Sequence, residues 1–174
     1  MGEITDIATA LRGGITAPAL LSPVHDTTAF NCGHEALDDY LRLRARKSSD
    51  GNLGKTFVVC HGVTVIGYYT LAMGAEKRAA VPKKMQKNSP DHIPLLLLAR
   101  LAVDDRFKRK GVGRALLKDA LLRAVQVSQI VGVRAVIVHA IDEEARSFYQ
   151  KYEFIEFPAE SRTMFLPIKS IKEA

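Results

Sequence analysis

The sequence predicts a mixed α/β fold in which one sheet carries helices on both faces. Apolar runs typical of strands alternate along the chain with segments whose apolar residues recur at helical spacing, and two strand-like runs follow the last such segment. Residues 95–103 form a near-continuous apolar run, as expected for a strand that is buried on both faces. The length of 174 residues is sufficient for one domain with a substantial core.

The first half of the chain predicts an arm, a strand, a helix and a hairpin. Residues 1–16 have little periodic pattern, so we expect a flexible N-terminal arm before a single domain over residues 17–174. A short strand is expected over residues 19–24. A helix should follow, because acid first and base last complements the helix dipole. It should open with Asn31, Gly33, Glu35, Asp38 and Asp39 and close with Arg42, Arg44, Arg46 and Lys47.

After a turn at residues 51–54, two antiparallel strands are predicted over residues 56–60 and 63–73, joined at His61-Gly62. A basic, irregular segment with Pro82 and Pro90 precedes the buried strand.

The second half predicts two helices and three strands. Leucines and alanines at helical spacing over residues 116–125 indicate a helix that ends by Gly132. A β-rich run covers residues 134–140. Asp142 is a good N-cap for a short helix over residues 143–152. Two last strands are expected; they cover residues 154–157 and 163–168.

Composition and charge narrow the class of protein. No apolar run approaches the ~20 residues of a membrane span, and the N-terminus lacks a signal-peptide pattern. The two cysteines, Cys32 and Cys60, have no metal-ligand spacing, which predicts reduced thiols, no metal and a cytoplasmic location. The net charge of +6 suits a polyanionic partner, although a solvated basic surface explains it equally well.

A strand, a glycine loop and a helix follow one another over residues 95–121. This order predicts an anion site, because free loop amides and the helix N-terminus both favour negative charge. The loop is neither a nucleotide P-loop nor a dinucleotide fingerprint, since the lysine-serine pair of the first and the third glycine of the second are missing.

Two motifs resemble the GNAT acyltransferase superfamily. Residues 108–117 resemble its acetyl-CoA motif, Gln/Arg-x-x-Gly-x-Gly/Ala, with Gly111 and Gly113 matching and Lys108 departing from the first position. Residues 142–154 resemble its Asn/Asp-x-x-Ala-x-x-Phe-Tyr-x-x-x-Gly-Phe segment, in which Glu153 replaces the glycine. The resemblance implies a mostly antiparallel mixed sheet and acetyl-CoA as cosubstrate, with no metal.

The resemblance also implies roles for individual residues. Tyr149 matches the tyrosine that commonly protonates the CoA thiolate, whereas the residues alone would favour a core tyrosine. The residues that the resemblance assigns to acetyl-CoA are Leu101, Ala102, Val103, Lys108, Arg109, Lys110, Gly111, Val112, Gly113, Arg114, Asp142, Ala145 and Phe148.

Within the superfamily, the chain is similar to the toxins of bacterial toxin–antitoxin pairs. The matching stretches are residues 30–41, 66–71 and 98–104. The resemblance implies N-acetylation of aminoacyl-tRNA and a block of translation. It further implies a ribbon-helix-helix antitoxin, contact with operator DNA only through the antitoxin complex, and a homodimer.

The acceptor side is predicted from charge. An α-amino group has a pKa of about 7.7–8.0, so a strong protein base is not required. His139 could assist; the alternative is a core or surface histidine. Arg100 is costly in an apolar strand unless it is paired or faces a cleft. The residues predicted to bind tRNA phosphates, or otherwise to be merely solvated, are Arg42, Arg46, Lys47, Lys77, Arg78, Lys83, Lys84 and Arg100.

Two other functions stay open from the sequence. One is a GNAT enzyme that acetylates a protein N-terminus or a small amine. The other is a non-catalytic module that binds CoA or DNA within a repressor complex.

Overall fold

The computed structural model describes residues 14–160 and 162–171. Of the predicted N-terminal arm, residues 1–13 lie outside this range. Ile15 forms an antiparallel bridge with His61, and the N–H of Thr16 donates to the Cys60 carbonyl at 2.8 Å. The chain divides into two compact units. Among the described residues, the first unit combines 14–72 with 100–120, and the second combines 73–99 with 121–160 and 162–171.

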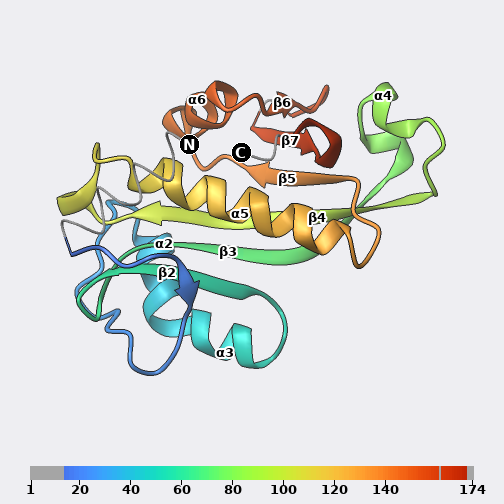
Figure 1. The fold of residues 1–174 in the computed structure, drawn as a ribbon. Coiled ribbons are helices and arrows are strands. Elements are labelled where there is room, and N and C mark those ends of the chain that lie inside the picture. Colours follow the sequence, from blue (N-terminus) through green and yellow to red (C-terminus); the bar gives the residue numbers. More distant parts are fainter. Residues whose placement is uncertain (1–13, 161, 172–174) are drawn as a thin grey trace. The chain divides into compact units, whose positions relative to one another are not determined.

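The sheet has the strand order β1-β2-β3-β4-β5-β7-β6 (Figure 1). The strands are β1 (Ala19–Leu20), β2 (Lys55–His61), β3 (Thr64–Lys77), β4 (His92–Val103), β5 (Ala135–His139), β6 (Ile155–Glu156) and β7 (Thr163–Pro167). Strands β4 and β5 are parallel, and the pairs β1–β2, β2–β3, β5–β7 and β6–β7 are antiparallel. The predicted mixed, mostly antiparallel sheet is confirmed.

The helical elements are mostly short. The α-helices are α2 (Glu35–Asp39), α3 (Ala45–Asp50), α4 (Lys83–Gln86), α5 (Val112–Ser128) and α6 (Glu143–Lys151). The other turns are the π-helical η1 (Tyr40–Arg44) and the 3-10 turns η2 (Arg78–Ala80), η3 (Asp105–Phe107) and η4 (Ile168–Ser170).

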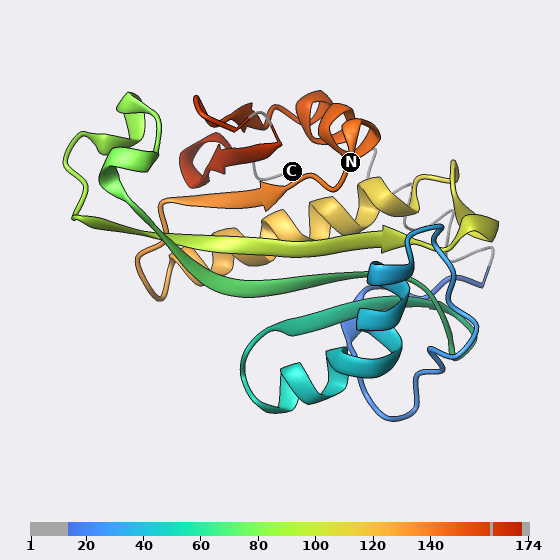
Figure 2. The ribbon, with the colours of Figure 1, turned by 180° about the vertical axis from the view of Figure 1, so that it is seen from behind.

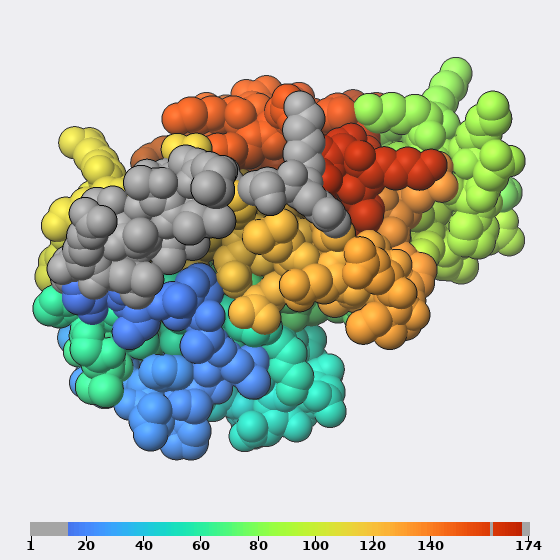
Figure 3. Space-filling model, in the orientation of Figure 1, coloured from blue at the N-terminus to red at the C-terminus, as the bar shows by residue number. Residues whose placement is uncertain are grey.

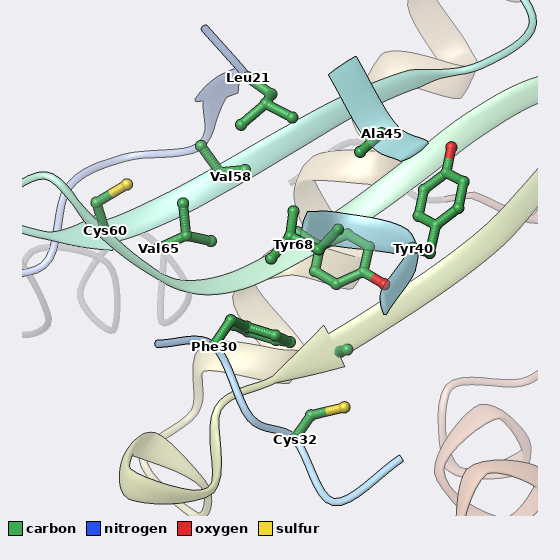
Figure 4. Close-up of a cluster of buried hydrophobic side chains, with 11 residues drawn as sticks. Leu21, Phe30, Cys32, Tyr40, Ala45, Val58, Cys60, Val65 and Tyr68 are labelled. Atoms are coloured by element: carbon green, nitrogen blue, oxygen red, sulfur yellow. The ribbon is translucent and has the colours of Figure 1, made fainter. Parts of the chain in front are cut away.

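In the first unit, helices cover both faces of β2 and β3, as predicted. Tyr68 is buried on one face, where its hydroxyl donates to the Leu37 carbonyl of α2 at 2.6 Å. Figure 2 shows α2 and α3 beside these strands, and Figure 4 shows the side chains of this face. Gly67 lies on the opposite face, where an added Cβ would approach Leu116 of α5 to 3.0 Å. A glycine at this position therefore lets α5 pack closely on β3.

The predicted helix over residues 31–47 needs correction at its start and in its middle. The helical segment begins only at Glu35, because Gly33 has a φ of +89° and Asn31 is bonded to the end of β4. In the middle, η1 widens the helix by one π-turn. The predicted first strand is also shorter, because Ser22 and His25 form a turn directly after it.

In the second unit, the basic segment after β3 is more ordered than predicted. Strand β3 continues to Lys77, and α4 follows η2. The apolar side chains of this segment, Val81 and Met85, join a core cluster with Ile137 of β5 and Phe165 of β7. Figure 3 shows the α4 segment in light green beside the red C-terminal strands.

The last helix follows the prediction. The Asp142 carboxylate caps α6 by accepting a hydrogen bond from the Ala145 amide at 2.8 Å. The helix ends at Lys151, and Glu153 then adopts a φ of +72°. This is the left-handed conformation that favours the glycine of the family pattern.

Candidate functional site

The predicted acetyl-CoA loop begins at a buried carboxylate. Asp104 directly follows β4 and is 1% exposed. Its Oδ1 accepts hydrogen bonds from the amide and the Nε of Arg106, both at 2.9 Å. Its Oδ2 accepts from Arg106 Nη2 and from the Asn31 amide, both at 3.1 Å. The Asp104 N–H donates to the Ile66 carbonyl at 2.8 Å, so the end of β4 is tied to β3 and to the segment before α2.

Two opposing effects set the pKa of Asp104. Burial on its own raises the pKa, but the hydrogen bonds from Arg106 and Asn31 outweigh it and hold the pKa below its ordinary value of 3.8. The carboxylate therefore stays charged at neutral pH and keeps the strand end and the loop joined.

Lys108 contacts the same N-terminal segment. Its ammonium donates to the Cys32 carbonyl at 2.7 Å and forms an ion pair with Asp105 at 2.8 Å. The Asp105 amide in turn donates to the Asn31 carbonyl at 2.9 Å. At the first position of the loop motif, the structure thus places a side chain that braces the loop against residues 31–32.

The loop enters α5 through two residues with left-handed backbone. Arg109 has a φ of +63° and Gly111 a φ of +80°. A Cβ at Gly111 would contact no other atom within 4 Å, so its backbone conformation, and not lack of space, favours glycine there.

The start of α5 fits an anionic group. The Ala115 N–H donates to the Gly111 carbonyl at 3.1 Å. The amides before Ala115, in the first turn, have no acceptor four residues back within the helix. No acidic residue stands in this turn. Amides and helix dipole together favour a diphosphate such as that of acetyl-CoA.

The end of β4 offers backbone beside the loop. Ala102 is buried in the core of the first unit, whereas Leu101 and Val103 are half-buried on alternate positions of the strand. Such a strand end presents main-chain groups that an extended, amide-bearing arm can pair with.

Tyr149 lies in the second unit, on α6. It is 7% exposed, and its ring lies 5.3 Å from the rings of both Phe148 and Phe154. Burial alone raises the pKa of its hydroxyl well above the ordinary value of 10.0, so the phenol is protonated at neutral pH. A protonated hydroxyl is the form required of a general acid. Asp142 and Ala145, also predicted at the site, form the cap of the same helix.

Arg100 stacks on the aromatic ring of Tyr40, the first residue of η1. Its guanidinium carbon lies 3.6 Å from the centre of the Tyr40 ring. This cation–π contact explains how β4 holds an arginine among apolar neighbours. Neither an ion pair nor an open cleft is needed to explain why an arginine stands in this strand.

The structure sorts the other predicted tRNA-binding cations into two groups. Arg42 donates to the Phe30 carbonyl at 2.7 Å, and Arg46 donates to the His25 carbonyl at 2.5 Å. Arg78 forms an ion pair with Asp91 at 3.1 Å. The contacts of these three arginines connect segments of the chain within one unit. Arg78 is exposed but ion-paired. The four predicted lysines are also exposed: Lys47 in the first unit, and Lys77, Lys83 and Lys84 in the second, where Lys84 also lies 5.4 Å from the centre of the Phe165 ring.

Sequence reasoning missed the part of the site contributed by residues 31–32. Asn31 and Cys32 hold the loop through main-chain groups, 73 and 76 positions away from their partners Asp104 and Lys108. No sequence pattern reports such backbone contacts. Within residues 14–160 and 162–171, no cluster of three metal-ligating side chains is found, and no helix is long and apolar enough to cross a bilayer.

Comparison with known proteins agrees with this geometry. A model of the acetyltransferase (GNAT) domain matches residues 52–156. The "tRNA-acetylating toxin" of Mycobacterium tuberculosis strain H37Rv is 39% identical over 159 residues, which cover 91% of this chain and 96% of that protein.

Solved structures of similar proteins include two forms of AtaT. AtaT complexed with acetyl-methionyl-tRNAfMet has a TM-score of 0.83 at 30% identity, covering 90% of this chain and 96% of that one. An AtaT mutant bound to acetyl-CoA and the C-terminus of the antitoxin AtaR has a TM-score of 0.78 at 28% identity, with 90% and 94% covered.

A third similar structure is a KacTA–DNA complex, with a TM-score of 0.77 at 27% identity and with 90% and 94% covered. The domain match spans both the loop before α5 and the helix that carries Tyr149. The chain belongs to the GNAT acetyltransferase family and is an acetyl-CoA-dependent N-acetyltransferase.

Proposed function

We propose that this chain is the toxin of a toxin–antitoxin pair and transfers the acetyl group of acetyl-CoA to the α-amino group of aminoacyl-tRNA. The observation that carries the proposal is the 39% identity, over nearly the whole chain, to a tRNA-acetylating toxin. Acetylation removes the nucleophilic amine that peptide-bond formation needs, so translation in the cytoplasm stops.

The end of β4 and the loop before α5 would hold the cosubstrate. The amides from Gly111 to Arg114 would bind the diphosphate at the start of α5, and the main chain of Leu101 and Val103 would pair with the pantetheine arm. Arg109 and Lys110 add positive charge, while Lys108 braces the loop. Acetyl-CoA supplies the activated acyl group, a thioester.

By resemblance to the family, Tyr149 would supply the proton for the leaving sulfur. Tyr149 is protonated at neutral pH, since burial raises its pKa, and a hydroxyl within hydrogen-bond reach of the sulfur can act as general acid. Asp142, Ala145 and Phe148 would position this helix and its tyrosine.

The exposed lysines would contact the tRNA. Lys47, Lys77, Lys83 and Lys84 are exposed, so they can approach phosphates without breaking the contacts that fix the arginines. This narrows the predicted surface of eight cations to the four that are lysines.

The partners follow from the same resemblance. A ribbon-helix-helix antitoxin would cover the toxin, and operator DNA would be contacted through that complex. A homodimer is part of the proposal. The structure of AtaT with the C-terminus of its antitoxin supports the first of these partners.

The decisive experiment uses labelled acetyl-CoA and total charged tRNA. We expect the label to appear in the tRNA pool and to disappear when the tRNA is first discharged. Label in a protein N-terminus or in polyamines would instead support the alternative acceptors, and no turnover with any acceptor would support a non-catalytic module.

A further inference from the structure

A chain of three polar side chains ends at an exposed histidine in the second unit. His139 is the last residue of β5 and pairs with Thr163 of β7. The Nδ1 of His139 lies 3.0 Å from the Thr163 hydroxyl oxygen. That hydroxyl donates to Glu160 Oε2, also at 3.0 Å. Thr163 is buried, whereas the imidazole is exposed.

The order of donors fixes the tautomer of the imidazole. An ionised carboxylate only accepts hydrogen bonds, so Thr163 must give its single hydroxyl proton to Glu160. The hydroxyl oxygen is then free only as an acceptor, and Nδ1 of His139 must be the donor. The remaining nitrogen, Nε2, therefore carries the lone pair in the neutral form. Protonation of Nε2 leaves the hydrogen bonds of Nδ1, Thr163 and Glu160 unchanged.

We infer that His139 is the general base that takes the proton from the acceptor amine, with Thr163 and Glu160 as the residues that position it. The inference deepens the proposed function: the acetyltransferase activity gives it a reaction, and the aminoacyl-tRNA acceptor gives it an α-amino group as substrate. Imidazole as a class titrates near neutral pH, which suits proton transfer from such an amine.

The placement of His139 fits this role. Every second residue of a strand shares one face, so His139 lies on the same face as Ala135 and Ile137, which pack into the core. It is the exposed member of that series. The chain then passes from His139 through Ala140 and Ile141 to Asp142, the cap of the helix that bears Tyr149 (Figure 1). A base and an acid thus come from one continuous segment of the second unit.

The proton and electron balance is complete without another reactant. Nε2 of His139 accepts one proton from the ammonium, which frees the nitrogen lone pair to form the C–N bond to the acetyl carbonyl carbon. The C–S bond breaks, its electron pair stays on sulfur, and the sulfur takes the Tyr149 hydroxyl proton. The nitrogen loses its second proton as the amide forms, and this proton restores the Tyr149 hydroxyl through water. The products are an N-acetyl amide and a free thiol, and the proton on His139 leaves to water.

The other charged groups at this end of β5 and β7 have partners of their own and do not break the hydrogen bonds among His139, Thr163 and Glu160. Glu160 accepts the Thr163 hydroxyl proton through Oε2. Arg162, the neighbour of Thr163 in sequence, is held by Glu143 at 3.6 Å and donates to the Ile141 carbonyl at 3.4 Å. Asp142 is engaged as the cap of α6.

The test compares His139→Ala with His92→Ala, a change at the exposed histidine that begins β4. We expect His139→Ala to lower kcat for acetyl transfer to charged tRNA about 100-fold below pH 7. The deficit should shrink above the amine pKa of about 7.7–8.0, where the amine loses its proton unaided. Added imidazole should restore part of the rate. His92→Ala should have the wild-type profile.

The positioning role has its own matched pair. Thr163→Ser keeps the hydroxyl and should retain activity, whereas Thr163→Val should lower kcat about 10-fold with an unchanged KM for acetyl-CoA. A His139→Ala enzyme with wild-type kcat at every pH, or one with a pH-independent loss that imidazole does not rescue, would overturn the inference. If aminoacyl-tRNA is not the acceptor, the wild-type enzyme itself will not transfer label to tRNA, and this outcome is separate from any effect of His139→Ala.

Discussion

The ammonium of Lys108 and the carbonyl oxygen of Cys32 are joined by a hydrogen bond of 2.7 Å. The bond connects the loop before α5 with the segment that leads into α2. It occupies the position at which the family pattern has glutamine or arginine. A departure from the pattern thus has a structural role: it links the loop before α5 to the segment that leads into α2.

Replacing Lys108 by Met should therefore weaken the fold as well as acetyl-CoA binding. The change leaves the Cys32 carbonyl without this donor, so we expect the free energy of unfolding to fall by about 1 kcal/mol. Urea denaturation measures this. Lys110→Met is the matched control. The Lys110 ammonium lies 5.3 Å from the centre of the Phe107 ring, and its removal should reduce cofactor affinity with unchanged stability. Equal stability of the two variants would contradict the bracing role.

Tyr149→Phe should abolish acetyl transfer and leave acetyl-CoA binding nearly intact. The change removes the proton donor but keeps the ring between Phe148 and Phe154. Loss of general acid catalysis predicts a fall in kcat of about 10²–10⁴-fold. Turnover assays and calorimetric titration with acetyl-CoA separate the two effects. Tyr152→Phe, directly after the same helix, is the control; near-normal turnover by Tyr149→Phe would refute the assignment.

The protein should lose stability when the pH rises above 10. The folded pKa values of Tyr68 and Tyr149 are raised by burial above the ordinary 10.0, so only the unfolded chain ionises there. The contribution is complete below pH 10 and declines as the pH rises, by about 1.4 kcal/mol per pH unit for each tyrosine. Urea denaturation at successive pH values measures the slope. Tyr149→Phe should remove roughly half of it, and an unchanged slope in that variant would speak against a buried hydroxyl.

Glu153→Gly should stabilise the protein by about 1 kcal/mol. Glu153 has a φ of +72°, which costs a residue with a Cβ about that much. Thermal and urea unfolding measure the gain. Glu153→Ala keeps the Cβ and should bring no comparable gain, so equal stabilisation by both variants would mean that relief of backbone strain is not the cause.

Removing the exposed lysines should weaken tRNA binding and its dependence on salt. In a variant that combines Lys77→Gln, Lys83→Gln and Lys84→Gln, the slope of log K against log salt should fall by about 0.7–0.9 for each phosphate that is no longer neutralised. Binding assays at several salt concentrations give the slope. Lys151→Gln serves as the single-lysine control on α6. A wild-type slope in the triple variant would exclude these lysines from the interface.

The parts of the fold that depend on local signals were predictable. The Asp142 cap needs only an aspartate three residues before the amide that it accepts from, and the buried strand shows itself as an apolar run. The loop before α5 was equally predictable from the sequence, because a strand, two glycines and a helix are adjacent there.

The parts that depend on distant partners were not predictable. The predicted start of the first helix was wrong, because backbone contacts of Asn31 with Asp104 and Asp105 keep that segment extended. Arg100 was expected to face the acceptor or an ion pair, and its position over Tyr40 depends on how a helix widens at η1. The hydrogen bonds of Thr163 to both His139 and Glu160 depend on strand register and a turn.

The π-turn η1 also limits how this protein can change in evolution. A π-turn is equivalent to one residue inserted into an α-helix, and each residue of an α-helix turns its neighbours by about 100°. Deleting one residue from Tyr40–Arg44 would restore a regular helix but rotate Tyr40 and Ala45 relative to each other. Either the ring would leave Arg100 or the alanine would leave the core. Length changes in this gene segment should therefore be tolerated after α3, near the exposed Leu53, and not within the helix.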